Sequence, residues 1–432
     1  SPHSRITPSV TPTKSPRLTT FLTHLTNTPT LNLSLFLLNI FRTKRLFSNI
    51  YLCKKKLFTG EFMKTMTPIY VTKPLLPPLD KYYEGLKRIW DSKILTNYGP
   101  IYNELLIALK DFLQVKNLSL LVNGHQALEI AISSLQLSGE VITTPFTFAS
   151  TTHAIVRSGL TPVFCDIRMD NYNMDESKIE ALITDRTSAI IPVHVYGTPC
   201  DVDAIDSIAK QHGLKVIYDA AHAFGVKIGD QGIGSFGDIS MFSFHATKVY
   251  NTIEGGALAF SNEELAKEIY LRQDFGISNA EEILLPGTNA KMNEFQALMG
   301  LLNLDCVNQE ISKRQQKAKL YCDYLNQIPG IKLLPYDYDK IKQNYAYFPI
   351  VLTEEYGLTR DELAVKLQEC NIFPRKYFFP LVTDFACYRG KFREEIPNAK
   401  YIADRVLCLP IWGEISTEVI SYICSIISDL HD

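Results

Sequence analysis

Two residues of opposite charge, each placed beside an apolar run, are the candidates for chemistry in this chain. Asp219 ends the apolar run 216–218, and Lys248 stands alone on a predicted loop between the strand-like run DISMFSF and the pair Gly255-Gly256. A lysine amine can form a Schiff base with pyridoxal 5'-phosphate, and a buried carboxylate can keep the pyridine nitrogen of that cofactor protonated. The two residues therefore predict a pyridoxal phosphate site in which Lys248 is catalytic and Asp219 binds the cofactor.

Simpler explanations exist for each residue alone. Aspartate is a favoured helix N-cap, so Asp219 could begin a helix at AAHAFG, and Lys248 could be one of many solvated surface lysines. For an isolated residue, each of these explanations is the more common one. An acid-ended strand, a lone lysine on a loop and a glycine pair rarely coincide within one short stretch, and together they favour the cofactor site.

Three glycines in the same stretch, Gly232, Gly234 and Gly237, match the spacing G-x-G-x-x-G. In dinucleotide-binding proteins this motif follows a strand and opens a helix. Here it leads into the strand-like run DISMFSF instead. We therefore predict a turn at these glycines and no dinucleotide site.

A candidate anion site lies at the turn Asn123-Gly124-His125-Gln126, between a predicted strand at 118–122 and a helical segment that follows. The free N–H groups and the dipole of a helix N-terminus attract anions, so a phosphate group fits at this turn. A plain strand-to-helix turn is the alternative, and it is the better explanation of the pattern in isolation.

Four blocks, DAAHAFG, GSFGD, SFHATK and EGG, occur in an order and spacing that resemble the DegT/DnrJ/EryC1/StrS family of sugar-nucleotide aminotransferases. A further block, GTNAKMNEFQALMGLLNLD, extends the resemblance, which covers the chain loosely from about residue 63 to its end. The resemblance implies an α/β fold, that of fold type I pyridoxal phosphate transferases. Such a fold has a mostly parallel central sheet with helices on both faces and a small C-terminal α+β domain.

The resemblance also implies which residues hold the cofactor phosphate. Gly124, His125 and Gln126 lie at the expected phosphate turn, and Ser243 is expected to contact the phosphate through its hydroxyl. The family usually has Gly-Thr where this chain has Gly124-His125. The backbone N–H of His125 is still available there, but the threonine hydroxyl is missing.

Two ring side chains are implied to contact the cofactor ring. Phe148 matches a family aromatic that stacks on the pyridine ring and excludes water from its face. His222 matches a position where the family has Gln or His near the ring or its oxygen. The alternatives are a core phenylalanine at a strand end and a histidine with satisfied hydrogen bonds on a helix.

The resemblance further implies a homodimer in which Asn289 or Lys291 reaches across the interface towards the neighbour's phosphate. Many relatives have arginine where Lys291 stands, so the choice between these two donors stays open. The aromatic and basic segment 373–390 matches a loop that helps to close the sugar-nucleotide pocket. Arg375, Lys376 and Tyr377 are therefore candidates for substrate binding, and ordinary surface and core positions are the alternative.

The implied activity is transamination. L-glutamate, the donor for most of the family, would pass its amine through the cofactor held by Lys248 to a nucleotide-linked 4-keto-6-deoxy sugar. The best match is dTDP-4-dehydro-6-deoxy-D-glucose, which would give an amino sugar for O-antigen or lipopolysaccharide biosynthesis. A 3-keto or GDP-linked sugar would use the same core. Relatives that act as dehydratases lack the lysine, and a regulatory protein that binds the cofactor without turnover is a remaining alternative.

Composition limits the class of protein. The 432 residues are 46% hydrophobic and 21% charged, an ordinary globular composition with room for two domains. No apolar run reaches the roughly 18 residues of a membrane helix, and beyond residue 62 the chain has 35 basic and 45 acidic residues, which disfavours nucleic-acid binding. The nine cysteines are scattered without C-x-x-C or metal-ligand spacing, so we expect reduced thiols, no metal site and a cytoplasmic location.

Residues 1–62 differ in composition from the remainder. They are rich in Ser, Thr and Pro and hold nine Lys or Arg residues but a single acid, Glu61. A transit peptide has this composition. The alternative, which we favour, is that the segment lies upstream of the true start, because Met63-Lys64-Thr65 looks like a natural beginning and the resemblance starts there. In both cases we expect a poorly packed, disordered extension.

Beyond this extension, the hydrophobic pattern predicts alternating strands and helices. Continuous apolar runs of the kind found in parallel sheets predict strands at 118–122, 162–166, 188–196, 215–219 and 256–260. Helices are predicted at 79–94, 104–113, 127–135, 152–158, 201–212, 294–304, 309–327, 359–370 and 417–429. We expect a large cofactor domain at 63–308 and a small domain at 309–432 that contains strands at 345–352 and 405–410.

Overall fold

The computed structural model describes residues 67–335, 340–392 and 394–431. The chain falls into two units, Ser1–Thr65 and Met66–Asp432, and every described residue lies in the second unit. The prediction for residues 1–62 therefore lies outside the described part of the chain. Among the described residues, no helix combines the length and the apolar character that crossing a bilayer requires.

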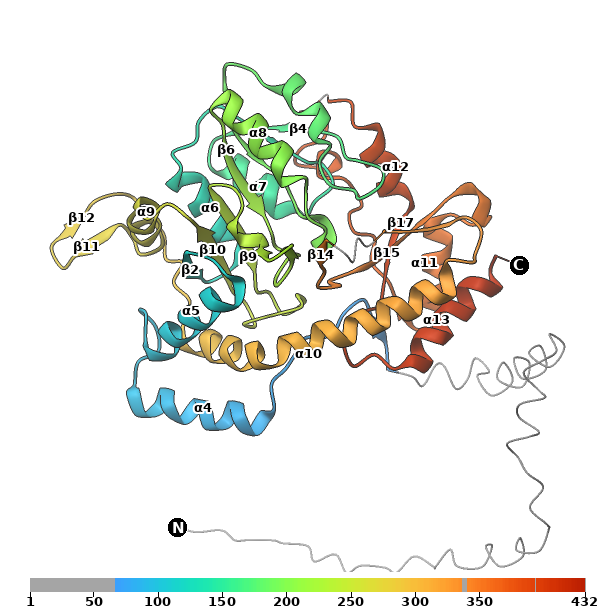
Figure 1. Cartoon of the computed structure of the whole chain (residues 1–432), viewed down its shortest axis with the longest axis horizontal. Helices are drawn as coiled ribbons and strands as arrows, with labels where there is room; N and C mark the ends of the chain where they lie inside the picture. Colours follow the sequence, from blue (N-terminus) through green and yellow to red (C-terminus); the bar gives the residue numbers. More distant parts are fainter. Residues whose placement is uncertain (1–66, 336–339, 393, 432) are drawn as a thin grey trace, which may run out of the picture. The chain divides into compact units, whose positions relative to one another are not determined.

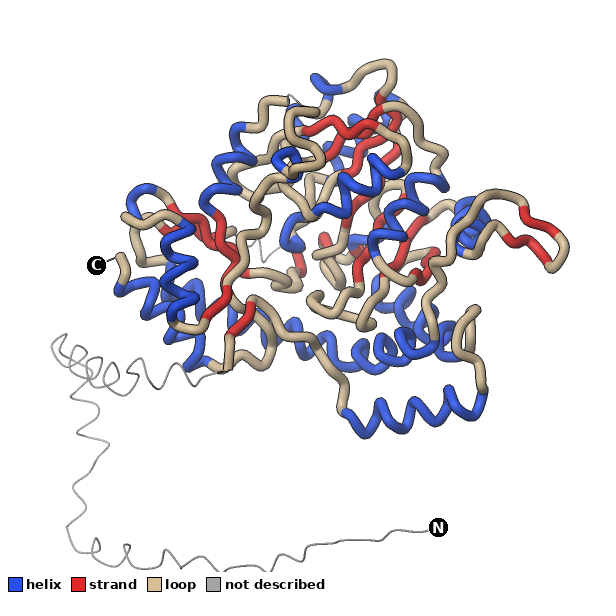
Figure 2. Tube along the Cα trace, turned by 180° about the vertical axis from the view of Figure 1, so that it is seen from behind, coloured by secondary structure: helices blue, strands red, loops and turns tan. Residues whose placement is uncertain are grey.

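A seven-stranded sheet lies at the centre of the described unit, with the strand order β2-β10-β9-β6-β5-β3-β4. β10 (Gly256–Phe260) pairs antiparallel with β2 (Asn117–Leu121) and β9 (Ile239–Ser243), and all other neighbours are parallel. The remaining strands are β3 (Glu140–Thr143), β4 (Thr161–Phe164), β5 (Thr187–Ile191) and β6 (Lys215–Asp219). The strands lie side by side with helices around them (Figures 1 and 2), which confirms the α/β prediction.

Helices cover both faces of this sheet, as the side chains of β10 show. Ala257 and Ala259 belong to one apolar core together with α5 (Pro100–Leu113) and α10 (Glu294–Leu325). Leu258 and Phe260 belong to another core with residues of α6 (Gly124–Ser134) and α9 (Glu264–Gln273). Successive side chains of a strand point to opposite faces, so each face of β10 has its own helical layer. The other helices of this part are α4 (Leu79–Ser92), α7 (Ala149–Arg157) and α8 (Val202–His212).

The long helix α10 corrects the sequence prediction. The sequence predicts two helices, at 294–304 and 309–327, whereas one helix runs from Glu294 to Leu325. The linking residues 305–308 contain neither glycine nor proline, so nothing in them interrupts the helix. The predicted domain boundary at residue 308 lies inside α10, and the division into two domains stays a prediction.

The C-terminal part contains an antiparallel sheet with the order β13-β15-β17. Its strands are β13 (Ile331–Leu333), β15 (Phe348–Leu352) and β17 (Val406–Leu409), and its helices are α11 (Arg360–Glu369), α12 (Pro397–Arg405) and α13 (Thr417–Asp429). The buried carboxylate of Asp166, beyond β4, accepts the N–H groups of Asn398 and Ala399 at 3.1 and 2.9 Å. It therefore caps α12, because the first N–H groups of a helix have no partner within it.

Several short elements carry too little pattern to be predicted. β1 (Ile69–Tyr70) pairs with β16 (Ile372–Phe373), and β14 (Ile341–Lys342), β7 (Lys227–Ile228) and β8 (Gln231–Gly232) form a small sheet. β11 (Ile277–Asn279) and β12 (Glu282–Ile283) form a hairpin that projects from the rest of the unit in Figures 1 and 2. The 3-10 turns are η1 (Glu176–Lys178), η2 (Glu180–Leu182), η3 (Val195–Gly197), η4 (Ile233–Ser235), η5 (Glu354–Tyr356) and η6 (Val382–Asp384).

The structure tests two further predictions, the turn at the three glycines and the strand at 188–196. The G-x-G-x-x-G stretch forms the 3-10 turn η4 and then β9, so the prediction of a turn without a dinucleotide helix is confirmed. The strand predicted at 188–196 is shorter in the structure, where β5 ends at Ile191. Pro192 follows it, and proline has no N–H to continue a strand ladder.

Candidate active site

One cavity gathers most of the predicted site residues. It holds about 550 Å³ and lies where β6 and β9 end and where α6 begins. The predicted residues that line it are Gly124, His125, Phe148, Asp219, His222, Ser243, Lys248, Arg375 and Tyr377. The predicted residues that do not line it are Gln126, Asn289, Lys291 and Lys376.

Lys248 places its amine in this cavity, on the loop that follows β9. The Nζ atom lies 6.0 Å from the centroid of the Tyr347 ring. Burial lowers the pKa of Lys248 to about 8, although the negative charge of Asp219 acts in the opposite direction. Near physiological pH a larger fraction of this amine is therefore neutral than for an exposed lysine, and the neutral form is the one that attacks a carbonyl carbon.

Asp219 ends β6 and is almost completely buried. Its Oδ2 atom accepts a hydrogen bond from the Thr151 hydroxyl at 2.8 Å, and its Oδ1 atom accepts the N–H of Ala221 at 3.1 Å. Burial raises the pKa of Asp219, while both hydrogen bonds and the charge of Lys248 favour the ionised form. Residues 220–226 form turns, so the alternative explanation of Asp219 as a helix N-cap is wrong.

His222 lies on the turn after β6, not on a helix. Its ring stacks on Phe378 at 5.7 Å between centroids and meets the ring of Tyr347 edge-on at 5.0 Å. The Nδ1 atom accepts the N–H of Tyr196 at 3.3 Å, and burial, together with the charge of Lys248, holds the pKa of His222 well below its ordinary value. A neutral imidazole that accepts at Nδ1 carries its proton on Nε2, so His222 is a hydrogen-bond donor at that atom.

The start of α6 and the end of β9 form a cradle with free donors. Asn123 caps α6 by accepting the N–H of Gln126 at 2.8 Å, whereas the N–H groups of Gly124 and His125 have no partner among the described residues. A Cβ atom at Gly124 would lie 3.0 Å from the Cβ of Ser243, so the lack of a side chain at Gly124 lets the turn lie close to the serine. Two N–H groups and one hydroxyl thus converge at a helix N-terminus, an arrangement that binds phosphate.

Gln126 and Lys376 point to other partners. The N–H of Gln126 is used by Asn123, and its side chain donates to Glu129 at 2.9 Å. The ammonium group of Lys376 forms an ion pair with Asp361 at 2.6 Å. Neither side chain is therefore presented to the cavity in this chain.

Lys291 and Asn289 lie on the segment that leads from the β11–β12 hairpin to α10. The amine of Lys291 forms an ion pair with Asp274 and lies 4.9 Å from the centroid of the Phe275 ring. Asn289 is exposed and pairs with Asp274 in an isolated β-bridge. Within one chain neither residue reaches the cradle, and their predicted role across a dimer interface stays a prediction.

Phe148 and Arg375 stand at the exposed edge of the cavity. Phe148 is 59% exposed, so the alternative of a core phenylalanine is wrong. Arg375 exchanges two backbone hydrogen bonds with Cys408, at 3.1 and 2.8 Å, and its guanidinium carbon lies 5.6 Å from the centroid of the Tyr377 ring. Both side chains face the space that a ligand would fill.

The cavity also contains residues that the sequence prediction missed, among them Thr147, Ser150, His245, Glu254 and Tyr347. His245 and Glu254 face each other, with 3.5 Å between Nε2 and Oε1. Both stand in the blocks SFHATK and EGG, so their position beside Lys248 was a usable signal. Tyr347 stands in an apolar run that indicates only a strand.

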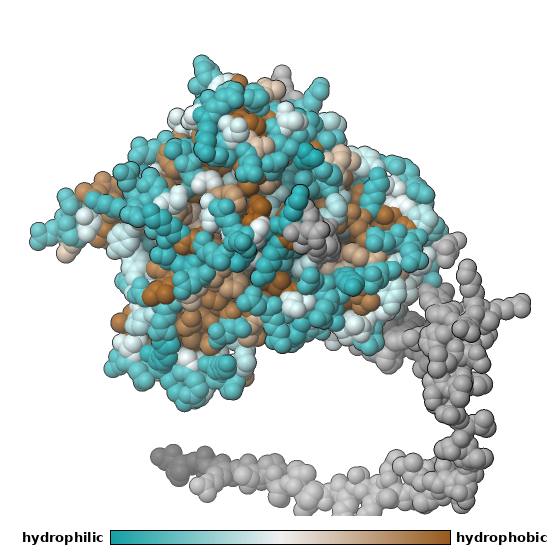
Figure 3. Space-filling view, in the orientation of Figure 1, coloured by the Kyte–Doolittle hydropathy of each residue, from teal (hydrophilic) through white to brown (hydrophobic). Residues whose placement is uncertain are grey.

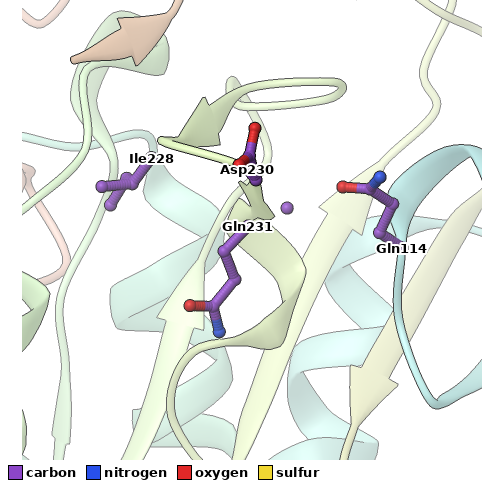
Figure 4. A pocket seen from close by; sticks show the side chains of 5 residues that line it. Gln114, Ile228, Asp230 and Gln231 are labelled. Atoms are coloured by element: carbon purple, nitrogen blue, oxygen red, sulfur yellow. The ribbon is translucent and has the colours of Figure 1, made fainter.

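A second hollow, of about 510 Å³, shares no lining residue with this cavity, and Figure 4 shows the side chains around it. Its walls are Gln114, Ile228, Asp230, Gln231 and Gly232. Figure 4 shows Gln114 approaching from the segment after α5, and Asp230 and Gln231 from the β7–β8 turn. No predicted site residue lines this hollow, and Asp230 is the charged residue on its walls.

Comparison with known proteins agrees with this geometry. The model of the DegT/DnrJ/EryC1/StrS aminotransferase family matches residues 80–428 of the chain. The dTDP-4-amino-4,6-dideoxy-D-glucose transaminase of Shigella dysenteriae is 43% identical over 364 residues, which cover 84% of this chain and 99% of that protein. The enzyme of the same name from Escherichia coli is 42% identical over 358 residues, which cover 82% and 96% respectively.

A solved structure gives the same picture at the level of the fold. The structure of DesI in the presence of its TDP-sugar product matches this chain with a TM-score of 0.81 and 34% sequence identity. The match covers 85% of this chain and 93% of DesI. The arrangement of strands and helices around the cavity is therefore shared with a protein that was solved with a nucleotide sugar.

Proposed function

The chain belongs to the DegT/DnrJ/EryC1/StrS aminotransferase family, and from this premise we propose that it transfers the amino group of L-glutamate to a nucleotide-linked 4-keto-6-deoxy sugar, with pyridoxal 5'-phosphate as cofactor. The preferred sugar is dTDP-4-dehydro-6-deoxy-D-glucose, because two relatives named for the corresponding amino sugar match over almost their whole length. One observation carries the proposal. The amine of Lys248 shares its cavity with the Asp219 carboxylate and with a phosphate cradle.

The residues of the cavity fit pyridoxal phosphate. The cradle of Gly124, His125 and Ser243 suits the phosphate, Lys248 suits the aldehyde carbon, and Asp219 suits the pyridine nitrogen. When bound, this cofactor supplies an electron sink for the charge left behind as a proton leaves the carbon next to the amine. The volume of about 550 Å³ leaves room for a substrate beside it.

Lys248 has two tasks in this proposal. Its amine would hold the cofactor, and as a free amine it would move a proton to and from the donor's α carbon. A general base works best when its pKa lies near the working pH. The pKa of about 8 that burial gives Lys248 meets this requirement.

The remaining residues hold the cofactor in place. Asp219, oriented by the hydrogen bond from Thr151, would hold the pyridine nitrogen in its protonated form. His222 donates from Nε2 towards the ring or its oxygen, because Nδ1 is engaged with Tyr196. Phe148 supplies an exposed aromatic face for stacking at the cavity edge.

A homodimer is part of the proposal. On or beside the β11–β12 hairpin, Phe275, Ile283 and Leu284 are 46%, 69% and 47% exposed. Apolar side chains gathered on a surface mark an interaction site, and Figure 3 shows brown patches of this kind on an otherwise largely hydrophilic face. The second subunit would cover such side chains and bring Asn289 or Lys291 to the neighbouring phosphate.

We also place the reaction in the cytoplasm, in the supply of an amino sugar for O-antigen or lipopolysaccharide biosynthesis. The described residues contain eight cysteines, all of them free, which suits a reducing compartment. Two relatives are named for the transamination that yields such an amino sugar.

The first half of the reaction is tested by the absorbance of the purified protein loaded with pyridoxal phosphate, before and after addition of L-glutamate. We expect a visible band that shifts to that of pyridoxamine phosphate, and we expect the Lys248→Ala variant to lack the lysine-linked band. A protein that binds no cofactor, or binds it and leaves L-glutamate unchanged, would overturn the proposal and favour a binding protein without turnover.

The second half is tested by adding keto sugars to the aminated protein. We expect dTDP-4-dehydro-6-deoxy-D-glucose to restore the original spectrum and to yield a 4-amino sugar by mass spectrometry and NMR. If only a GDP-linked or a 3-keto sugar restored the spectrum, the protein would still be a transaminase, but that sugar would be its substrate.

A further inference from the structure

Arg375 reaches the cavity with most of its hydrogen-bonding capacity unused. Two backbone hydrogen bonds to Cys408 of β17 fix its main chain, and its Nε atom donates to the Tyr377 hydroxyl at 3.4 Å. The two terminal nitrogens have no partner among the described residues. Those nitrogens form the planar fork that binds a carboxylate or a phosphate through two parallel hydrogen bonds.

The two neighbouring cations already share an ion-pair partner. Asp361 accepts the guanidinium of Arg360 and the ammonium of Lys376, at 2.5 and 2.6 Å. Arg375 forms no ion pair with any described residue. Of these three basic side chains, it is therefore the one whose charge remains available to a ligand.

Arg375 differs from the other charged residues of the cavity wall in carrying a permanent positive charge. The described residues that line the cavity include one lysine, Lys248, and one arginine, Arg375. Its acidic residues are Asp219 and Glu254. The amine of Lys248 is committed to the cofactor and is partly neutral, because burial lowers its pKa to about 8. Arg375 supplies the permanent positive charge for an anionic substrate.

Two aromatic rings lie next to the two cationic side chains of the cavity. Lys248 Nζ lies 6.0 Å from the centroid of the Tyr347 ring, and the Tyr347 and Tyr377 rings are 5.6 Å apart. The guanidinium carbon of Arg375 lies 5.6 Å from the centroid of the Tyr377 ring. The amine and the guanidinium thus each lie next to one ring of an adjacent aromatic pair, and all four side chains line the same cavity.

We propose that Arg375 is one anion site that both substrates use in turn. In the first half of the reaction it binds the side-chain carboxylate of the dicarboxylic amino donor, and in the second half it binds the diphosphate of the nucleotide sugar. Both anions stand several bonds from the carbon that exchanges the amine. The proposal rests on the transamination proposed above, and it makes Arg375 a specificity residue for the donor as well as for the sugar nucleotide.

The shared site is tested by equilibrium binding to the cofactor-loaded protein, which needs no turnover. Glutarate, a dicarboxylate without an amine, and thymidine diphosphate are the probes. We expect each to weaken the binding of the other in the wild-type protein, and we expect Arg375→Gln to bind both about 10-fold or more weakly. Arg88→Gln, which removes a half-exposed arginine of α4, is the matched control and should bind as the wild type does.

Donor choice gives a second measurement. We expect Arg375→Gln to slow the spectral change with L-glutamate about 10- to 100-fold while leaving that with L-glutamine, the uncharged isostere, almost unchanged. Equal losses with both donors would make Arg375 a structural residue, and unchanged binding of either glutarate or thymidine diphosphate would overturn the shared site. If neither amino acid changed the spectrum of the wild-type protein while glutarate and thymidine diphosphate still competed, transamination would be refuted. The shared anion site would then still stand.

Discussion

The Thr151 hydroxyl donates a hydrogen bond to Oδ2 of Asp219 across 2.8 Å, and both side chains are almost fully buried. The bond joins α7 to the end of β6, and the Thr147 hydroxyl lies 2.9 Å from the same Thr151 oxygen. Burial favours the neutral form of a carboxyl group, whereas hydrogen bonds to the carboxylate favour the charge. Thr151 therefore helps to preserve the charge that the proposed cofactor needs.

The first prediction removes this hydrogen bond. In Thr151→Val the pKa of Asp219 should rise further, and the affinity for pyridoxal phosphate should fall by about 10-fold, since a hydrogen bond to a charged group contributes about 1.5–3 kcal/mol. Thr152→Val is the matched control, because the buried Thr152 hydroxyl has no partner among the described residues. Equilibrium dialysis measures both affinities, and equal affinities in the two variants would contradict the role of Thr151.

The second prediction concerns the titration of Lys248. In the cofactor-free protein its acetylation by acetic anhydride, followed by mass spectrometry, should increase with pH around a midpoint of about 8. Asp219 raises the pKa of this amine, so Asp219→Asn should move the midpoint to lower pH. A midpoint above 10 in the wild type would mean that burial does not govern the amine, and a shift to higher pH in the variant would reverse the sign of the coupling.

The sequence predicted elements and residues whose signals are local. The strands Lys215–Asp219 and Gly256–Phe260 have their predicted bounds, because each is a short apolar run between polar or turn residues. The bond between Thr151 and Asp219 joins residues 68 positions apart, and no periodic pattern indicates it. The pairing of Lys376 with Asp361 is equally remote from local signals, although it decides which basic side chain faces the cavity.

The third prediction tests the phosphate cradle. A Cβ atom at Gly256 would lie 2.7 Å from the backbone nitrogen of Gly124, closer than two such atoms can approach, so Gly256→Ala should displace one of the free N–H donors. We expect the variant to bind pyridoxal phosphate about 10-fold more weakly and to bind pyridoxal, which has no phosphate, as the wild type does. If the affinities for both compounds fell equally, the substitution would act on a part of the site other than the phosphate cradle.

The fourth prediction concerns Asn344, which ties the segment before Tyr347 to the turn that carries His222. Its amide donates to the backbone oxygens of His222 and Phe224 at 2.7 and 3.0 Å, and the side chain is fully buried. Asn344→Ala leaves two buried carbonyls without a donor, so the free energy of unfolding should fall by about 2–4 kcal/mol. Urea denaturation measures this, with the exposed Asn326→Ala as a control that should stay within about 0.5 kcal/mol of the wild type. A similarly small change for Asn344→Ala would show that the turn does not need this support.

The last prediction tests the homodimer through the β11–β12 hairpin. Ile283 is 69% exposed in a single chain, so Ile283→Asp should not disturb folding, but a carboxylate there would be costly if a second subunit covers it. We expect the variant to sediment as a monomer and to bind pyridoxal phosphate about 10-fold more weakly, because Asn289 or Lys291 of the second subunit would no longer reach the cradle. Val365→Asp on α11, where the valine is 51% exposed, is the matched control and should remain dimeric. A wild-type protein that is monomeric and fully active would overturn the dimer, whereas a dimeric Ile283→Asp variant would exclude the hairpin from the interface.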